Sequence, residues 1–68
     1  MQKWEYMLLI QGWNEEERIF YWDDDRDDKR NQIERLNALG QEGWELASSH
    51  NLGTLVGGYA FILKRPVE

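Results

Sequence analysis

WEYMLLIQ, residues 4–11, is the stretch of sequence that decides the fold. Four apolar side chains share one face of it by the two-residue period of a β-strand: Trp4, Tyr6, Leu8 and Ile10. The other face carries Met7 and Leu9 in its middle, between polar residues. A strand that is apolar on both faces is usually covered on both sides. The stretch therefore predicts a β-strand that needs packing on each face.

A second strand and a helix are predicted from the residues that follow. Residues 12–17 have the composition of a turn, and the aromatic and β-branched residues 18–22 favour a strand. Asp23-Asp24-Asp25 then supplies an N-cap and acids for the positive end of a helix dipole. Apolar residues recur at three-residue steps after it. The pattern predicts a helix from Asp25 to Leu39, with Gly40 as its C-cap.

Two more strands are predicted after the helix. Residues 44–49 form the third strand, and residues 50–54 have the composition of a turn. The fourth strand runs from Leu55 to Arg65. Gly57-Gly58 predicts a bulge or a close backbone approach in this strand, and Pro66 predicts its end.

The order ββαββ predicts the α+β fold class. We expect one domain, residues 1–68, in which a four-stranded, mainly antiparallel sheet has one helix packed on one face. A helix of about 15 residues covers only one face of four strands. The first and last strands are nevertheless apolar on both faces. A second copy of the chain is the expected cover, so we expect a homo-oligomer.

The composition agrees with self-association. A chain of 68 residues has a marginal core, which small domains supplement with disulfides, a structural metal or oligomerisation. The sequence has no cysteine, which excludes disulfides and thiolate zinc sites and fits a reducing cytoplasm. No signal peptide is recognisable, and the apolar run near the N-terminus, residues 6–10, is far shorter than a membrane helix. We expect a cytoplasmic protein that does not meet a membrane.

The net charge of −5 is concentrated in one segment. Residues 14–28 hold eight acidic side chains against Arg18 and Arg26. Such a field repels phosphate backbones, so duplex nucleic acid is not expected as a partner. A basic protein surface or a cation is favoured instead.

Three segments resemble one known family: KWEY at residues 3–6, LNALGQEGWEL at residues 36–46, and FILKRP at residues 61–66. Together they resemble the small bacterial, archaeal and phage proteins of the domain of unknown function 4177 family. The central segment is the specific part, and the resemblance covers nearly the whole chain. It implies a compact domain of strands and a helix, and it implies no activity.

The sequence offers little catalytic chemistry. His50 follows two serines, and neighbouring residues of a strand point to opposite sides, so a local Ser–His pair is not expected. The acids at residues 23–28 are assigned to the helix start, with a weak Ca²⁺ or Mg²⁺ site as the alternative. The glycine-rich residues 53–58 lack the ending of a phosphate loop. They serve a turn and a bulge, or bring bare backbone close to a ligand or neighbouring subunit. We expect no enzyme, no metal site and no cofactor.

The aromatic residues indicate candidate binding positions, because nine in this chain exceed what a marginal core requires. Those in the family-like segments are assigned to the core: Trp4, Tyr6, Trp44 and Phe61. Exposed tryptophans are enriched at binding hot spots, and Trp13 lies in a polar turn of the predicted fold. The candidate binding residues are three aromatics and three arginines: Trp13, Arg18, Tyr21, Trp22, Arg26 and Arg65.

Two functions remain open. The first is a non-catalytic, homo-oligomeric interaction module, which meets a basic protein partner through acidic residues 14–28 and the exposed aromatics. The second is a protein that binds or sequesters a small nucleotide-like ligand at a subunit interface, as a phage-encoded sequestering protein would. In the second case the aromatic faces stack on a base and the arginines bind its phosphates.

Overall fold

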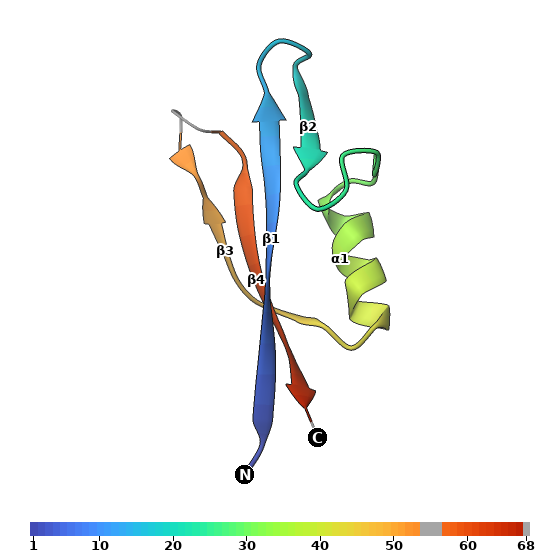
Figure 1. Cartoon of the computed structure of the whole chain (residues 1–68), viewed down its shortest axis with the longest axis vertical. Helices are drawn as coiled ribbons and strands as arrows, with labels where there is room; N and C mark the ends of the chain where they lie inside the picture. The colour runs from blue at the N-terminus through green and yellow to red at the C-terminus, as the bar shows by residue number, and fades with distance from the viewer. Residues whose placement is uncertain (54–56, 68) are drawn as a thin grey trace.

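A four-stranded antiparallel sheet with one helix makes up the structure, a computed structural model that describes residues 1–53 and 57–67. The elements are β1 (Lys3–Asn14), β2 (Ile19–Trp22), α1 (Gln32–Gln41), β3 (Glu45–Asn51) and β4 (Tyr59–Val67). The sheet order is β2-β1-β4-β3, and every neighbouring pair is antiparallel (Figure 1). The predicted α+β fold with the order ββαββ is confirmed.

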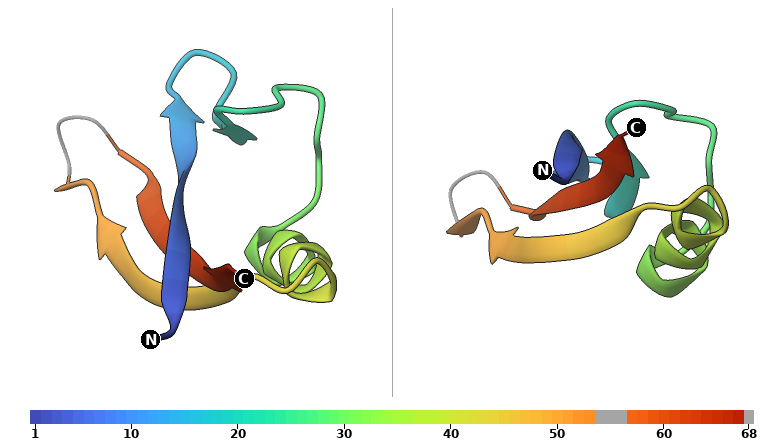
Figure 2. Two further views of the ribbon diagram at one scale, coloured as in Figure 1. Left: turned by 60° about the horizontal axis from the view of Figure 1, so that its bottom comes forward. Right: turned by 90° about the horizontal axis from the view of Figure 1, so that it is seen from below.

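The sheet is built on the long pairing of β1 with β4. Their register runs from Lys3 opposite Val67 to Gln11 opposite Tyr59. On its other side β1 pairs with β2, but only from Gln11 to Asn14. Residues 3–10 of β1 therefore have a strand neighbour on one side only. The molecule is elongated, with extents of 47 × 22 × 16 Å, and the sheet is strongly twisted (Figure 2).

The core lies between the sheet and α1. Five buried side chains form it, four from the strands and one from the helix: Leu9, Trp22, Phe61, Leu63 and Leu39. The strand register explains why these residues meet, since Leu9 lies opposite Phe61 and Gln11 lies opposite Trp22. Residues opposite each other in an antiparallel pair share a face. Partly buried side chains complete the layer: Met7, Leu36, Trp44 and Tyr59.

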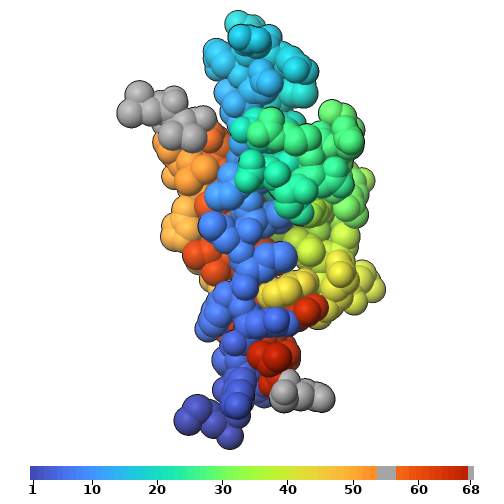
Figure 3. Space-filling model, viewed as in Figure 1, coloured from blue at the N-terminus to red at the C-terminus, as the bar shows by residue number. Residues whose placement is uncertain are grey.

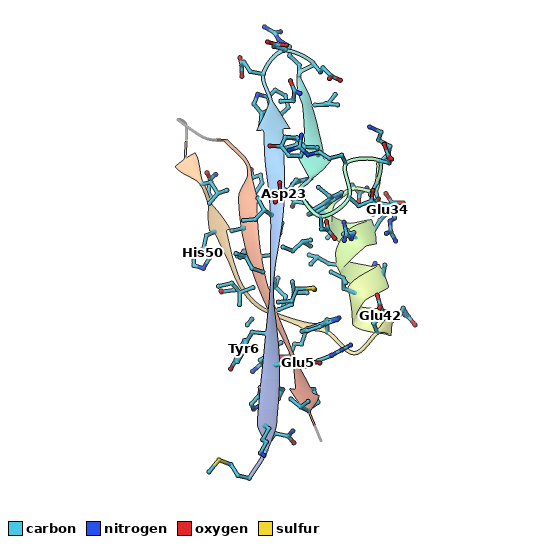
Figure 4. The ribbon with its side chains drawn as sticks, viewed as in Figure 1. Glu5, Tyr6, Asp23, Glu34, Glu42 and His50 are labelled. Atoms are coloured by element: carbon cyan, nitrogen blue, oxygen red, sulfur yellow. The ribbon has the colours of Figure 1, made fainter. Side chains whose placement is uncertain are left out.

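The other face of the sheet is open. Trp4, Tyr6 and Leu8 of β1 point to it, and they are 42%, 65% and 63% exposed. The assignment of Trp4 and Tyr6 to the core is therefore wrong, because α1 packs on the face that carries Leu9. No helix or strand of residues 1–53 and 57–67 lies over the open face, and Figure 4 shows Tyr6 and His50 directed away from α1.

The helix is shorter than the sequence pattern predicts. It begins at Gln32, and Asn31 is its N-cap. The side chain of Asn31 accepts the backbone N–H of Glu34, whose side chain accepts that of Asn31, which makes a capping box. The start predicted at Asp25 is wrong, because residues 23–28 form turns and carry an isolated bridge to Trp22.

The helix end also differs from its prediction. Gly40 lies inside the last turn, and Gly43, with φ of +92°, is the left-handed residue that follows the C-cap. The backbone N–H groups of Gly43 and Trp44 donate to the carbonyls of Gly40 and Leu39, at 3.0 and 3.1 Å. These two bonds form a Schellman motif, which turns the chain into β3.

Three strand ends are corrected by the structure. β1 continues through Gly12 to Asn14, so the turn between β1 and β2 is shorter than predicted. β3 includes His50, which sequence reasoning placed in a turn. β4 continues through Pro66 to Val67. The predicted start of this strand at Leu55 lies outside the described residues.

Gly57 and Gly58, before β4, allow a close approach of two backbone segments, which was one of the two predictions for them. A side chain at Gly58 would clash with the backbone of Gln11, and one at Gly57 would press on Trp13. The register shift that a bulged strand would produce is found in β3, between Leu46 and Ser48.

Candidate functional site

The six predicted binding residues do not converge on one site. Tyr21 and Arg26 do meet, because the Arg26 guanidinium lies 4.0 Å from the centroid of the Tyr21 ring. The Tyr21 ring covers Gly12 of the neighbouring strand, where any side chain would clash with it. Arg26 also lies 3.9 Å from the carboxylate of Asp23, and both side chains are well exposed. This is a cation–π contact on the open side of the hairpin.

Trp22 is not a surface residue, as sequence reasoning supposed. It is 1% exposed, and its Nε1–H donates to the backbone carbonyl of Arg30 at 2.8 Å. Its ring lies 6.1 Å from that of Phe61, and the Arg35 guanidinium lies 5.2 Å from its ring. Trp22 is the centre of the core because the register places it opposite Gln11, on the face that α1 covers.

Trp13 is part of β1 and not of a loop. It pairs with Phe20, their ring centroids lie 4.7 Å apart, and its Nε1–H donates to Glu15 at 2.8 Å. Arg18 lies in the turn that follows, in the left-handed region with φ of 56°. Its backbone N–H donates to the Asn14 carbonyl at 2.7 Å, which closes the turn. Trp13 and Arg18 thus have clear structural roles at the hairpin end.

Arg65 lies at the other end of the molecule. Its guanidinium pairs with Glu5 across the β1–β4 ladder and lies 4.3 Å from the ring of Trp44. It also donates to the Glu42 carbonyl at 3.3 Å. Arg65 therefore ties the end of the helix to the sheet, and it lies far from Arg18 and Arg26 along the long axis of the molecule.

The acidic run is held by arginines that follow it. Asp28 accepts hydrogen bonds from the backbone N–H and the side chain of Arg30, and Arg35 approaches it at 3.4 Å. Arg35, 7% exposed, also pairs with Asp24. Hydrogen bonds from the side chain and backbone of Arg30 lower the pKa of Asp28 to about 2. The acids fasten this loop over Trp22, which is a different role from the helix capping that sequence reasoning gave them.

In the part of the chain that the structure describes, no group of three His, Cys, Asp or Glu side chains is arranged to hold a metal ion. No helix within that part has the length and apolar character needed to cross a bilayer.

One Ser–His contact corrects an expectation. Ser48 and His50 are two residues apart in β3 and share a face, and Ser48 Oγ lies 3.2 Å from His50 Nε2. Only Ser49, the direct neighbour of His50, points to the opposite face of the strand. A nucleophile also needs its base oriented by a third group and an oxyanion site. In residues 1–53 and 57–67, His50 makes no second side-chain hydrogen bond.

The open face is the largest feature that sequence reasoning misassigned. Trp4, Tyr6 and Leu8 form an exposed apolar row on β1, and Lys64 of β4 lies 4.5 Å from the Trp4 ring. Figure 3 shows side chains of β1 at the surface along the length of the molecule. The signal that could have identified this face is the hairpin register. A turn closed between Asn14 and Arg18 places Trp22 on the face opposite to this row.

A groove lies on the other side, between β2 and the segment that precedes α1. It has a volume of about 470 Å³. Ile19, Phe20 and Trp22 form its apolar wall, and Lys29 and Arg30 lie on its polar wall. Phe20 is 48% exposed. The groove thus brings an exposed aromatic ring close to Lys29 and to the ion pair of Arg30 with Asp28.

No protein-family model, curated protein or solved structure matches this chain. The resemblance to the domain of unknown function 4177 family therefore stays a prediction.

Proposed function

We propose that this chain is a non-catalytic interaction module that works as a homo-oligomer in the cytoplasm. The observation that carries the proposal is the exposed apolar row on β1, formed by Trp4, Tyr6 and Leu8. Large apolar side chains gathered on one uncovered surface mark an interaction site. The lack of cysteine supports the cytoplasmic part of the proposal.

The surface area of the chain supports a second copy as the occupant. A compact monomer of this mass exposes roughly 4,500 Å², whereas the chain exposes 5295 Å². The excess is close to the roughly 800 Å² that each partner contributes to a standard protein interface. A second copy would supply a matching row of apolar side chains, as the symmetry of homodimers requires.

The acidic segment, residues 14–28, has a separate part in the proposal from the association of two copies. Asp24 and Asp28 are already bound to arginines of the same chain. The exposed Glu16 and Glu17 at the hairpin turn remain available to a basic protein partner. The proposal includes no catalysis, and the lowered pKa of Asp28 supports that part for this residue, because acid–base catalysis needs a carboxyl group whose proton can move.

Sedimentation velocity and light scattering over a range of protein concentrations test the proposal. Leu8→Lys places a charge in the exposed row and should shift the chain to the monomer. Ile33→Lys is the matched control, because Ile33 is 67% exposed on α1 while Leu8 is 63% exposed on the sheet. Ile33→Lys should associate as the unaltered chain does. A strict monomer up to about 1 mM would refute the proposal.

A small aromatic anion is the second candidate ligand, and the groove beside β2 favours it. Phe20 offers a ring for stacking and Lys29 offers positive charge, whereas Arg30 on the same wall is paired with Asp28. Arg18, Arg26 and Arg65 do not surround this groove, so the cations that this candidate uses differ from those expected from sequence. Thermal-shift measurements with nucleoside mono- and triphosphates test it, since a ligand at 100 times its Kd adds about 2.7 kcal/mol of stability. Equal melting temperatures with and without every nucleotide would exclude it.

A further inference from the structure

The backbone of β1 has a free edge below β2. The carbonyl of Ile10 accepts the N–H of Asp23 at 2.9 Å, so the backbone groups of Ile10 point away from β4. Backbone groups of an antiparallel strand alternate between its two sides. The β1–β4 register is continuous from Lys3 to Gln11. The N–H and C=O groups of Leu8, Tyr6 and Trp4 therefore also point away from β4.

Pro66 supports this alternation independently. It lies within β4, opposite Trp4, although proline has no N–H for a strand ladder. The position is tolerated only if the ring nitrogen points away from β1, and β3 does not reach this far because its pairing begins at Glu45 opposite Lys64. In a non-hydrogen-bonded pair, the backbone N–H and C=O groups of both residues point away from the partner strand. Because Pro66 and Trp4 form such a pair, the backbone groups of Trp4 also point away from β4.

These three residues present six backbone groups to the same edge. Within residues 1–53 and 57–67, no strand pairs with this side of β1 before Gln11, and no backbone hydrogen bond from a turn or loop reaches Trp4, Tyr6 or Leu8. Nothing lies in front of this part of β1 in Figure 3. Unpaired strand edges of this kind are templates for pairing with another chain.

We propose that a second copy of the chain pairs antiparallel with this edge, with Tyr6 opposite Tyr6 of the second copy. The inference rests on the self-association proposed above and specifies that the two copies meet edge to edge, with the two rows of apolar side chains next to each other on one face of the joined sheet. Trp4 then lies opposite Leu8 of the second copy, and each of the three pairs exchanges two hydrogen bonds. The two sheets become one, with β1 of each copy at its centre.

Neighbouring registers are less favourable. A pairing centred on Glu5 places like charges directly opposite each other, which is destabilising. A pairing centred on Met7 places Trp4 opposite Ile10 of the second copy, whose carbonyl already accepts Asp23. Only the register centred on Tyr6 pairs these three residues solely with one another.

Side chains and charges agree with the register. None of Trp4, Tyr6 and Leu8 is charged, and large apolar side chains that lie opposite each other stabilise a sheet.

Cysteine trapping tests the geometry, because the chain has no cysteine of its own. A hydrogen-bonded antiparallel pair has Cα atoms about 5.5 Å apart, which suits a disulfide. Tyr6→Cys should therefore form a covalent dimer under mild oxidation. Ser48→Cys is the control on the same face of β3, where edge pairing separates the two copies by about 24 Å, five strand spacings. It should stay uncrosslinked.

Tyr6→Pro and Tyr6→Ala form a second pair of variants. Proline removes one edge-facing N–H from each copy and leaves the β1–β4 ladder intact, whereas alanine keeps the N–H and removes only the ring. We expect Tyr6→Pro to dimerise roughly 30-fold more weakly than Tyr6→Ala, with an unchanged far-UV circular dichroism spectrum.

The outcomes separate the two proposals. If the chain dimerises but Ser48→Cys crosslinks and Tyr6→Cys does not, edge pairing is wrong and self-association stands. Equal dimerisation of folded Tyr6→Pro and Tyr6→Ala overturns edge pairing in the same way. A chain that remains monomeric overturns both.

Discussion

Replacing Trp22 by phenylalanine tests the centre of the structure. Trp22 is 1% exposed, and its Nε1–H donates to the carbonyl of Arg30. The smaller ring buries roughly 40 Å² less apolar surface, which costs about 1 kcal/mol. The cavity it leaves costs about as much again, and the lost hydrogen bond costs about 1 kcal/mol. We expect the free energy of unfolding to fall by about 3 kcal/mol, out of the roughly 3–10 kcal/mol typical of a domain this size.

The matched control is Trp13→Phe. Trp13 is half-buried, and the residue that accepts its Nε1–H, Glu15, is exposed, so we expect a loss below about 1 kcal/mol. Urea denaturation followed by far-UV circular dichroism measures both losses. Both variants must be studied at one protein concentration, since self-association shifts apparent stability. Equal losses for the two variants would show that Trp22 is not the buried centre.

Three further predictions concern the loop and the helix ends. The pKa of Asp28 is lowered from 3.8 to about 2, so its contribution to stability is complete above pH 3.8 and is lost as the pH falls towards 2. The variant Asp28→Asn should lose this part of the acid dependence, which urea midpoints measured from pH 5 to pH 2.5 would show. Gly43→Ala should destabilise the fold by about 1 kcal/mol because φ is +92° there. Gly40→Ala, where a Cβ has open space, should stabilise the fold by about 0.5–1 kcal/mol. If thermal unfolding shows stability changes of the same sign for both variants, the Schellman assignment is wrong. Asn31→Ala should cost about 1 kcal/mol in the same assay, and an unchanged midpoint would speak against its role as the N-cap.

The element order could be predicted from sequence because it depends on local patterns. The alternation in residues 4–11 and the three-residue spacing of apolar residues around Leu36 are local signals, and both elements exist in the structure. Element boundaries were less accurate. The run Asp23-Asp24-Asp25 resembled an N-cap, but the reciprocal pair Asn31 and Glu34, three residues apart, is the stronger signal and marks the true start.

Which face of the sheet is buried could not be predicted from alternation alone. Alternation separates Trp4 and Tyr6 from Leu9, but it does not say which set the helix covers. That choice is set by the hairpin register, which places Trp22 beside Gln11, and by the loop that Asp28 and its arginines fasten over it. The predicted surface position of Trp22 was wrong for the same reason, because a tryptophan in a short polar context can be either a surface anchor or the centre of a small core.

The pairing of β1 with β4 has a consequence for how the chain folds. The two central strands of the sheet are the first and last strands of the described chain, and their ladder joins Lys3 to Val67. No central pairing exists until the 47 residues between Gln11 and Tyr59 have closed into a loop. Proteins dominated by such distant pairings fold slowly, because the entropy of loop closure is lost before the contacts form. While a ribosome is still making the chain, β1 has only the short β2 beside it, and such a hairpin is marginal by itself.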